Sequence, residues 1–285
     1  MPFFSVVIAA YNKAQTIRTT LDSLHQQRFS DFEIIVVDDG SVDETATIVK
    51  GYTSSNLKYV YQENQGVTAA RNKGVACSSG RYLSFLDADD WVAPDWLEQF
   101  HLLLGTGQYD IAFCDVEVRD QSKQTVKVTK ARFPYRDTVE DRNGLFLTGA
   151  FCVERDFFVK LGMYDSNIRF GENAELSFRF FKNKVRRGFT DSTGMYYIIS
   201  GFGGSKNLKN KVNDTLYILN KHRDLFKRYS ELEVPYLQSI ASSYFELGEY
   251  SNSFKYYFKS WLLRPFSLRK FLRIFRPFYL FIKRK

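Results

Sequence analysis

The sequence is poor in the residues that build disulfide-rich or zinc-binding proteins. It contains three cysteines and three histidines among 285 residues. The cysteines Cys77, Cys114 and Cys152 are odd in number and form no Cys-x-x-Cys pair, which indicates neither a disulfide framework nor a zinc site. None of the histidines lies in a carboxylate motif. This pattern favours a reducing, cytoplasmic setting.

Long apolar segments and the common nucleotide-binding loops are absent as well. The longest uncharged apolar runs, such as residues 6–11 and 277–282, are far shorter than the roughly 20 residues of a membrane-spanning helix. The first ten residues lack the basic start of a signal peptide, and we interpret them as a buried strand. No GxxxxGKS/T loop occurs and no GxGxxG follows that strand, so ATPase and dinucleotide-dehydrogenase functions lose their main support.

The net charge of +8 is concentrated at the C-terminus. Residues 259–285 contain nine Lys or Arg and no Asp or Glu, which leaves 31 basic and 32 acidic residues in the rest of the chain. A cationic amphipathic segment followed by the apolar run 278–282 favours peripheral contact with an anionic membrane. A docked helix with a solvated basic face is the alternative. No nucleic-acid-binding motif is visible, so nucleic acid is not an expected partner.

The order of apolar runs predicts an α/β fold. Strand-like runs alternate with helical patterns over the first 90 residues, which is typical of a parallel, doubly wound sheet; the strands are 3–10, 33–37, 57–61 and 82–86. Later patterns predict helices over 94–104, 154–161 and 172–184 and strands over 111–118, 125–133 and 195–200. We therefore expect a Rossmann-like, mixed but mostly parallel sheet flanked by helices over residues 1–205.

The remaining chain, residues 206–285, is predicted to be helical. The spacings from Ala241 through Gly248 to Pro265 are similar to those of one tetratricopeptide hairpin, with a small residue in the first helix and a glycine at the turn. We expect a C-terminal helical region that combines this hairpin with the basic amphipathic tail.

Polar residues follow each of the first four predicted strands. They are Tyr11 and Asn12, Asp38 to Ser41, Glu63 to Gly66, and Asp87 to Asp90. Ligands of open α/β sheets bind at the carboxyl ends of the strands, so these segments predict one shared site. Asp87 and Asp89 are spaced to offer hard oxygen ligands to Mg²⁺ or Mn²⁺, and a bound diphosphate would supply the remaining ligands.

Two of these segments also carry helix-start signals. Ser41 and Glu44 form a capping box that predicts a helix towards Val49. Residues 65–72 are small at a helix start and place Arg71 one turn in, where a helix N-terminus and a guanidinium both favour an anion.

Together the four segments resemble family 2 glycosyltransferases of the GT-A fold. The similar stretches are VVIAAYN at 6–12, IIVVDDGS at 34–41, NQGV and ARN within 64–72, and FLDADD at 85–90. Four motifs in order at compatible spacing are highly specific, and the resemblance covers residues 3–205. It implies an inverting transfer of a sugar from a nucleoside diphosphate sugar, most often a UDP-sugar.

The resemblance also assigns roles to individual residues. It implies that Ala9 and Tyr11 line the base pocket, that Asp39 hydrogen-bonds the uracil, and that Arg71 helps to hold the nucleotide. It implies further that Asp87 lies by the ribose or sugar and that Asp89 coordinates the Mn²⁺ or Mg²⁺ that bridges the diphosphate. A metal there would stabilise the departing diphosphate.

The sequence offers more than one candidate for the residue that takes the proton from the acceptor hydroxyl. Family members carry an acidic pair followed by Leu and Arg, and here the usual base position, counted back from Arg179, is Asn173, whose amide accepts no proton at neutral pH. Three explanations compete: Glu172 is the base, Glu175 is the base, or the protein has little activity. We favour Glu172, which adjoins the expected position, whereas Glu175 has the spacing of a helix ion pair with Arg179.

These observations lead to one expected function and two alternatives. We expect a metal-dependent glycosyltransferase of cell-envelope polysaccharide biosynthesis, cytoplasmic and peripheral on the inner face of the membrane, with a lipid-linked or polysaccharide acceptor. One alternative is a nucleotide-sugar-binding protein without turnover, motivated by Asn173. The other is a nucleotidyltransferase, which normally has a Gly-rich, basic N-terminal loop that residues 9–13 lack.

Overall fold

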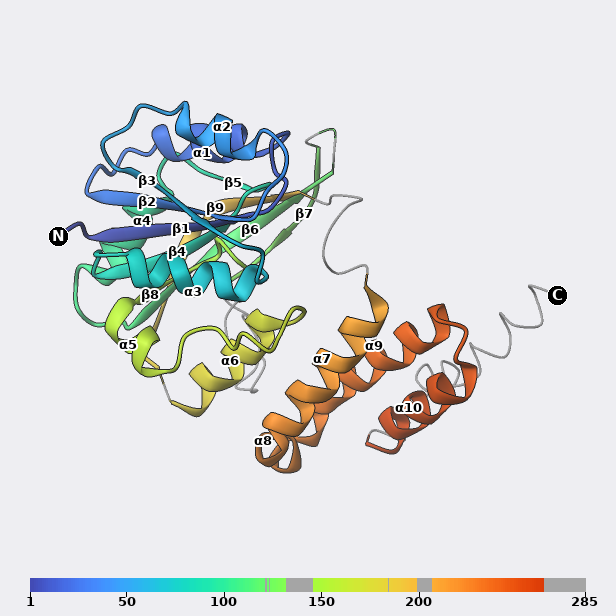
Figure 1. The fold of residues 1–285 in the computed structure, drawn as a ribbon. Coiled ribbons are helices and arrows are strands. Elements are labelled where there is room, and N and C mark those ends of the chain that lie inside the picture. Colours follow the sequence, from blue (N-terminus) through green and yellow to red (C-terminus); the bar gives the residue numbers. More distant parts are fainter. Residues whose placement is uncertain (121, 123, 132–145, 184, 199–206, 264–285) are drawn as a thin grey trace. The chain divides into compact units, whose positions relative to one another are not determined.

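The computed structural model describes residues 1–120, 122, 124–131, 146–183, 185–198 and 207–263 (Figure 1). The chain divides into two compact units, Met1–Ser166 with Glu172–Gly201, and Asn167–Gly171 with Phe202–Lys285. The predicted boundary after Ser205 lies outside the described residues and stays a prediction.

One mixed sheet organises the first unit. Its described strands are β1 (Phe4–Ala10), β2 (Phe32–Asp39), β3 (Leu57–Gln62), β4 (Tyr82–Asp87), β5 (Trp91–Val92), β6 (Ile111–Arg119), β7 (Thr125–Thr129), β8 (Phe151–Glu154) and β9 (Arg187–Ile198). Their order is β3-β2-β1-β4-β8-β6-β9-β5, with β7 paired to β6. β1 to β4 are parallel to one another and β9 is parallel to β6, whereas β5, β7 and β8 pair antiparallel.

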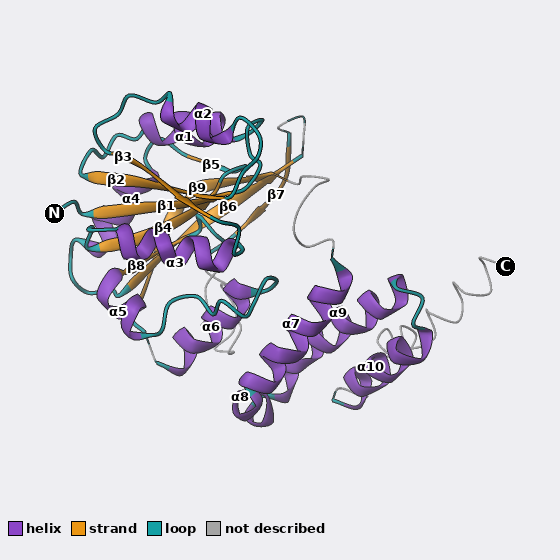
Figure 2. Ribbon diagram, viewed as in Figure 1, coloured by secondary structure: helices purple, strands orange, loops and turns teal. Residues whose placement is uncertain are grey.

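Helices pack on both faces of this sheet (Figure 2). One core receives side chains from α1 (Ile17–His25), α2 (Thr45–Lys50) and α4 (Trp96–Leu104). The other receives them from α3 (Val67–Cys77), α5 (Arg155–Lys160) and α6 (Glu172–Lys182). The predicted α/β class and the mixed, mostly parallel sheet flanked by helices are confirmed.

The unbroken apolar runs of the central strands follow from this layering. In β1, Val6 and Ile8 enter the core shared with α1, whereas Val7 enters the core shared with α3, and all three are fully buried. A strand covered on both faces has no solvent side, so its sequence does not alternate with polar residues.

The helix after β2 begins later than the capping-box prediction required. Helix α2 begins at Thr45, and the side chain of Asp43 accepts the Thr45 N–H at 3.0 Å. The Ser41 hydroxyl instead accepts the Asn12 N–H at 3.0 Å. The predicted capping box is therefore wrong, because the Ser41 hydroxyl joins the loop after β1 to the loop after β2.

Two strands and two boundaries also differ from the prediction. The short strands β5 and β8 were not predicted, and β9 begins at Arg187, eight residues before the predicted start at Met195. β7 ends at Thr129 within the predicted range 125–133. A strand of two or four residues is too short to show periodicity, so pairing with its neighbours decides it.

The second unit is helical over its described residues. It contains α7 (Leu208–Lys221), α8 (Arg223–Arg228), a 3₁₀ turn (Ser230–Leu232), α9 (Glu233–Glu246) and α10 (Tyr250–Leu262). α9 and α10 form the predicted hairpin, with Gly248 at a positive φ of 80° between them and Ala241 packed against Tyr257. Pro265 and the rest of the basic tail from residue 264 onward lie outside the described residues. None of the described helices is long and apolar enough to cross a bilayer.

Candidate active site

The loops after β1 and β2 are joined by hydrogen bonds. Asn12 Oδ1 accepts the Val42 N–H at 2.9 Å, and Asp43 accepts the Ala14 N–H at 3.0 Å. Asn12 adopts a positive φ of 52°, which asparagine tolerates better than most residues. The first two polar strand exits therefore form one connected structure.

Asp39 connects the exits of β2 and β3. Its carboxylate accepts the Gln62 side-chain amide at 2.7 Å and the backbone N–H groups of Gln65 and Gly66 at 2.9 and 2.8 Å. The side chain is almost fully buried. Gly40, at φ 78°, makes the adjoining turn, and a Cβ there would lie 2.9 Å from the Asn64 nitrogen. Asp39 is thus fixed against the loop that joins β3 to α3.

Ala9 and Tyr11 lie at the end of β1. Ala9 is aligned with Val37 in β2 and with Asp87 in β4, and it is partly buried. Tyr11 exposes 48% of its surface in the loop that follows. An exposed aromatic ring beside buried strand ends is available to stack on a planar ligand.

The segment Asp87-Ala88-Asp89-Asp90 ends β4 and is held by α1. Thr16 donates its hydroxyl to the Ala88 carbonyl at 2.8 Å, and Thr20 donates to the Asp90 carbonyl at 2.7 Å. Asp87 and Asp89 keep about a third and a quarter of their side-chain surface exposed. Asp89 forms an ion pair with Lys13 from the first exit.

Asp90 is the buried member of this acidic turn. Its Oδ1 accepts the Ile198 N–H at 3.1 Å, and its Oδ2 has no hydrogen-bond partner among the described residues. Burial, followed by the charges of Asp87 and Asp89, raises the pKa of Asp90 well above its usual range. The turn therefore concentrates negative charge that a cation would stabilise.

The acidic turn fits a divalent cation that a diphosphate helps to hold. Carboxylate oxygens suit Mg²⁺ and Mn²⁺, and both ions usually keep several ligands from water or phosphate. Within the described ranges, no group of three or more His, Cys, Asp or Glu is arranged to hold a metal ion by itself. The donor set of Asp89 and its neighbours thus suits a metal that arrives with phosphate oxygens.

Arg71 is the centre of a buried polar cluster. It exposes 3% of its surface and donates to Asp87 and Glu172 at 2.8 Å each and to Thr148 at 3.0 Å. Its guanidinium lies 5.2 Å from the centre of the Tyr164 ring. Burial lowers the pKa of Arg71, but Asp87, Tyr164 and Glu172 raise it by more, so the group stays charged.

The partners of the Arg71 guanidinium come from distant parts of the chain. The residue therefore bridges Asp87 at the end of β4 and Glu172 at the start of α6, and Arg71 itself lies 101 positions before Glu172 in the sequence.

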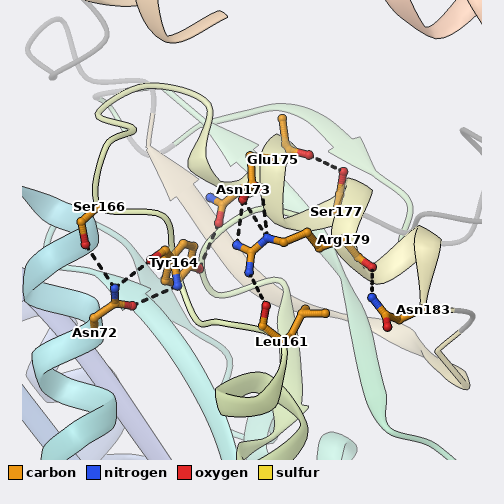
Figure 3. A network of polar contacts seen from close by, with 10 residues as sticks. Asn72, Leu161, Tyr164, Ser166, Asn173, Glu175, Ser177, Arg179 and Asn183 are labelled. Carbon is orange, nitrogen blue, oxygen red and sulfur yellow. Dashed lines mark hydrogen bonds and ion pairs between the residues drawn. The ribbon is translucent and has the colours of Figure 1, made fainter. Parts of the chain in front are cut away.

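Asn173 is held in place by two hydroxyl groups. Tyr164 donates its hydroxyl to Asn173 Oδ1 at 3.1 Å, and Asn173 Nδ2 donates to Thr148 at 3.2 Å. Tyr164 is itself fixed by reciprocal backbone hydrogen bonds with the Asn72 side chain, at 2.8 and 3.0 Å (Figure 3). The amide therefore occupies a well-defined position next to Glu172.

Glu172 and Glu175 have different surroundings on the same helix. Glu175 is fully buried and forms hydrogen bonds of 2.7–3.0 Å with Arg179, which also donates to the Leu161 carbonyl at 3.0 Å (Figure 3). Glu172 exposes 15% of its side chain and meets Arg71 through Oε1. Glu175 thus holds the Arg179 side chain that links α6 to the end of α5, whereas Glu172 belongs to the cluster around Arg71.

Sequence reasoning missed Lys13, Thr148 and Tyr164 as members of this site. Lys13 directly follows the motif at 6–12, so its place in the sequence could have identified it as a member of the site. Thr148 and Tyr164 lie in loops without periodicity, and no pattern marked them. The predicted site residues at the four strand exits are linked pairwise, from Asn12 to Val42, from Asp39 to Gln65, and from Lys13 to Asp89.

The family profile described as "Glycosyl transferase family 2" matches residues 5–162 of this chain. This range contains all four motifs and more than half of the sequence. The chain belongs to glycosyl transferase family 2. The predicted family, a glycosyltransferase family, is therefore confirmed.

Curated relatives of this family 2 glycosyltransferase carry the same class name. The glycosyltransferase EpsH of Bacillus subtilis is 39% identical over 126 residues, 43% of this chain and 36% of EpsH. The uncharacterized glycosyltransferase RP339 of Rickettsia prowazekii is 32% identical over 189 residues, 64% of this chain and 59% of RP339. The chain therefore spans about a third to three fifths of the length of these relatives.

Solved structures show the same fold. TarS of S. aureus, residues 1–349 in complex with UDP-GlcNAc, matches with a TM-score of 0.68 at 19% identity, covering 91% of this chain and 81% of that one. The same TarS fragment in complex with UDP matches with a TM-score of 0.62 at 17% identity, covering 93% and 92%. At this identity the likeness concerns the fold, and it supports the predicted GT-A architecture.

Proposed function

We propose that this protein transfers a sugar from a UDP-sugar to an acceptor hydroxyl, with inversion and with the help of Mn²⁺ or Mg²⁺. One observation carries the proposal: hydrogen bonds and ion pairs link the loops after β1, β2 and β4 and the start of α6 around Asp39, Arg71, Asp87 and Asp89. The TarS structures with UDP-GlcNAc and UDP, which share the fold, support the choice of donor.

The donor end of the site is assigned to the strand exits. Ala9 and Tyr11 would border the base, and Asp39 would accept a hydrogen bond from the uracil while keeping its loop contacts. Asp87 would bind the ribose or sugar, held in place by Arg71. Asp89 would coordinate the metal, which when bound neutralises the charge that develops on the departing diphosphate.

The acceptor end is assigned to Glu172. The acceptor hydroxyl oxygen attacks the anomeric carbon from the face opposite the diphosphate. The new C–O bond forms as the bond to the diphosphate breaks, and the hydroxyl proton passes to the Glu172 carboxylate. Arg71 would orient that carboxylate before the proton arrives.

A ligand panel tests the donor assignment. Thermal unfolding with Mn²⁺ is measured in the presence of UDP, several UDP-sugars, UTP and GDP-mannose. A ligand at 100 times its Kd raises the free energy of unfolding by about 2.7 kcal/mol, so a true donor raises the Tm by several degrees. Stabilisation by UTP over UDP would support the nucleotidyltransferase alternative and contradict this proposal.

Replacement of the base tests the catalytic assignment. Glu172→Gln keeps an oxygen for Arg71 but cannot take a proton, so kcat should fall by about 100- to 10,000-fold while the Kd for UDP changes little. The unfolding curve of Glu172→Gln, compared with that of the wild type, is the control for effects on α6. Unchanged turnover in Glu172→Gln would remove Glu172 as the base.

The second candidate function is nucleotide-sugar binding without turnover, and it rests on Asn173. Its amide occupies the position that the family resemblance assigns to the base, and it is held there by Tyr164 and Thr148. If the wild type binds UDP-sugar but never releases UDP, and Asn173→Asp gains release, this candidate is the correct one.

The acceptor and the membrane contact are proposed from the basic tail. A lipid-linked or polysaccharide acceptor would be met at an anionic inner leaflet, with the cationic segment supplying the attraction. Truncation before Pro265 should weaken binding to anionic liposomes, and added salt should weaken binding of the full chain. Equal binding by both forms would favour the docked-helix alternative.

A further inference from the structure

An ion pair joins the first and the fourth strand exits. The Lys13 ammonium contacts Oδ2 of Asp89, the residue that the proposed function assigns to the metal. The two side chains expose 29% and 26% of their surface, so the pair remains within reach of solvent and ions. The positive charge that Asp89 meets in this structure is therefore supplied by the protein.

Hydrogen bonds with Thr45 and Thr16 hold the loop of Lys13 and the turn that carries Asp89. The Lys13 N–H donates to Thr45 Oγ1 at 2.8 Å, which fixes the Lys13 backbone against the start of α2. Thr16 donates its N–H to the Lys13 carbonyl at 3.0 Å and its hydroxyl to the Ala88 carbonyl at 2.8 Å. The loop that carries Lys13 and the turn that carries Asp89 are thus tied to each other.

A divalent cation and the Lys13 ammonium compete for the same carboxylate. A metal that approached Asp89 alone would have to displace the ammonium and would be repelled by its charge. Such a metal would also find few further protein ligands among the described residues. A metal that binds together with a diphosphate brings phosphate oxygens as ligands. The freed Lys13 ammonium can then form an ion pair with the diphosphate.

We propose that Lys13 is the counter-ion of Asp89 in the donor-free enzyme and moves to the diphosphate when the metal–nucleotide complex binds. The inference rests on the proposed function, because it requires Asp89 to be the metal-binding carboxylate. Lys13 then suppresses binding of metal alone and strengthens binding of metal with nucleotide. A partly exposed ion pair is weak enough to be exchanged in this way.

Metal binding in the absence of turnover tests the inference. Electron paramagnetic resonance of free Mn²⁺ gives the Kd for Mn²⁺ alone, and calorimetry gives the Kd for UDP in saturating Mn²⁺. Lys13→Met keeps the aliphatic stem and removes the charge. It should bind Mn²⁺ alone at least about fivefold more tightly than the wild type, and UDP with Mn²⁺ at least about fivefold more weakly.

Lys58→Met is the matched control, because Lys58 is exposed on β3 and its replacement makes the same change in net charge. Its two Kd values should equal those of the wild type. Unfolding curves of both variants show whether they fold alike. A gain in Mn²⁺ affinity by Lys58→Met equal to that of Lys13→Met would mean that net charge alone is responsible, and it would overturn the inference.

The outcomes separate the inference from the function on which it rests. If the wild type binds UDP with Mn²⁺ but Lys13→Met binds Mn²⁺ alone no more tightly, the inference is wrong and the proposed function stands. If Lys13→Met gains Mn²⁺ affinity but keeps full UDP affinity, transfer of the ammonium to the diphosphate is wrong. If the wild type binds no UDP with or without Mn²⁺, both proposals fall.

Discussion

Removal of the Arg71 side chain should cost the protein a large part of its stability. In the wild type the guanidinium is 97% buried and holds two carboxylates, Asp87 and Glu172, at 2.8 Å each. Removing one partner of a buried ion pair typically costs about 3–5 kcal/mol, because the other charge is left buried and unpaired. Asp87 exposes about a third of its side chain, so we expect Arg71→Ala to lose about 3 kcal/mol.

The loss is measurable by urea and thermal unfolding at neutral pH. For a unit of this size, about 3 kcal/mol corresponds to a fall in Tm of roughly 6–12 °C. Arg71→Lys keeps the charge but cannot reach Asp87, Glu172 and Thr148 with one ammonium, so it should lose roughly 1–2 kcal/mol. Arg28→Ala, at an exposed site, should lie within about 0.5 kcal/mol of the wild type.

A loss below about 1 kcal/mol for Arg71→Ala would refute this reasoning. It would mean that water satisfies Asp87 and Glu172 when the guanidinium is gone, and that Arg71 does not hold the two ends of the site together. A double replacement with Glu172→Gln separates the pairwise contribution from the rest. If the cluster acts as described, the double variant should be less destabilised than the sum of the single ones.

Three further perturbations follow from the packing and charges. Burial raises the pKa of Glu33, but hydroxyl and backbone N–H donors lower it by more. The ionised Glu33 carboxylate therefore stabilises the fold above about pH 4.5, and this contribution is lost as pH falls through the lowered pKa. Glu33→Gln should therefore lose about 1–2 kcal/mol in urea unfolding at pH 7, and this loss should shrink as pH falls below about 4.5; a pH-independent loss would contradict this. Gly74→Ala should destabilise by about 1–3 kcal/mol in thermal unfolding, although alanine favours helices, because its Cβ would lie 2.3 Å from Val7 Cγ1; a gain in Tm would show that α3 can shift freely. Glu175→Gln should lose about 3 kcal/mol by leaving Arg179 without its buried partner, and a Tm equal to the wild type would refute that structural role.

The strand exits show how much of the site could be predicted from the chain. The runs 6–12 and 34–41 combine a buried strand with polar residues directly after it, and parallel strands in register must bring such exits to one edge. Ala9 is indeed aligned with Asp87, and Ala10 with Asp38. The same local logic failed for Ser41, because a hydroxyl that can cap a helix can equally accept a hydrogen bond from the loop of another strand.

The acceptor end of the site shows the limit of sequence reasoning. Glu172 was chosen because it adjoins Asn173, which is a local argument. Its contact with Arg71, and the shared use of Thr148 by Arg71 and Asn173, join residues 25 to 101 positions apart. Nothing in the local pattern around Thr148 or Tyr164 marks such a contact, because it depends on how α6 packs beside β4.

The sequence alone determined the α/β class, the family and the residues at the strand exits, because burial on both faces and the polar turns leave a local pattern. Only the tertiary structure decided which charges meet. It paired Lys13 with Asp89 and enclosed Arg71 between Asp87 and Glu172, whereas the pair of Glu175 with Arg179 follows from the spacing of residues in one helix. An ion pair depends on distances of a few ångströms between separate elements, and those distances are fixed by packing rather than by spacing along the chain.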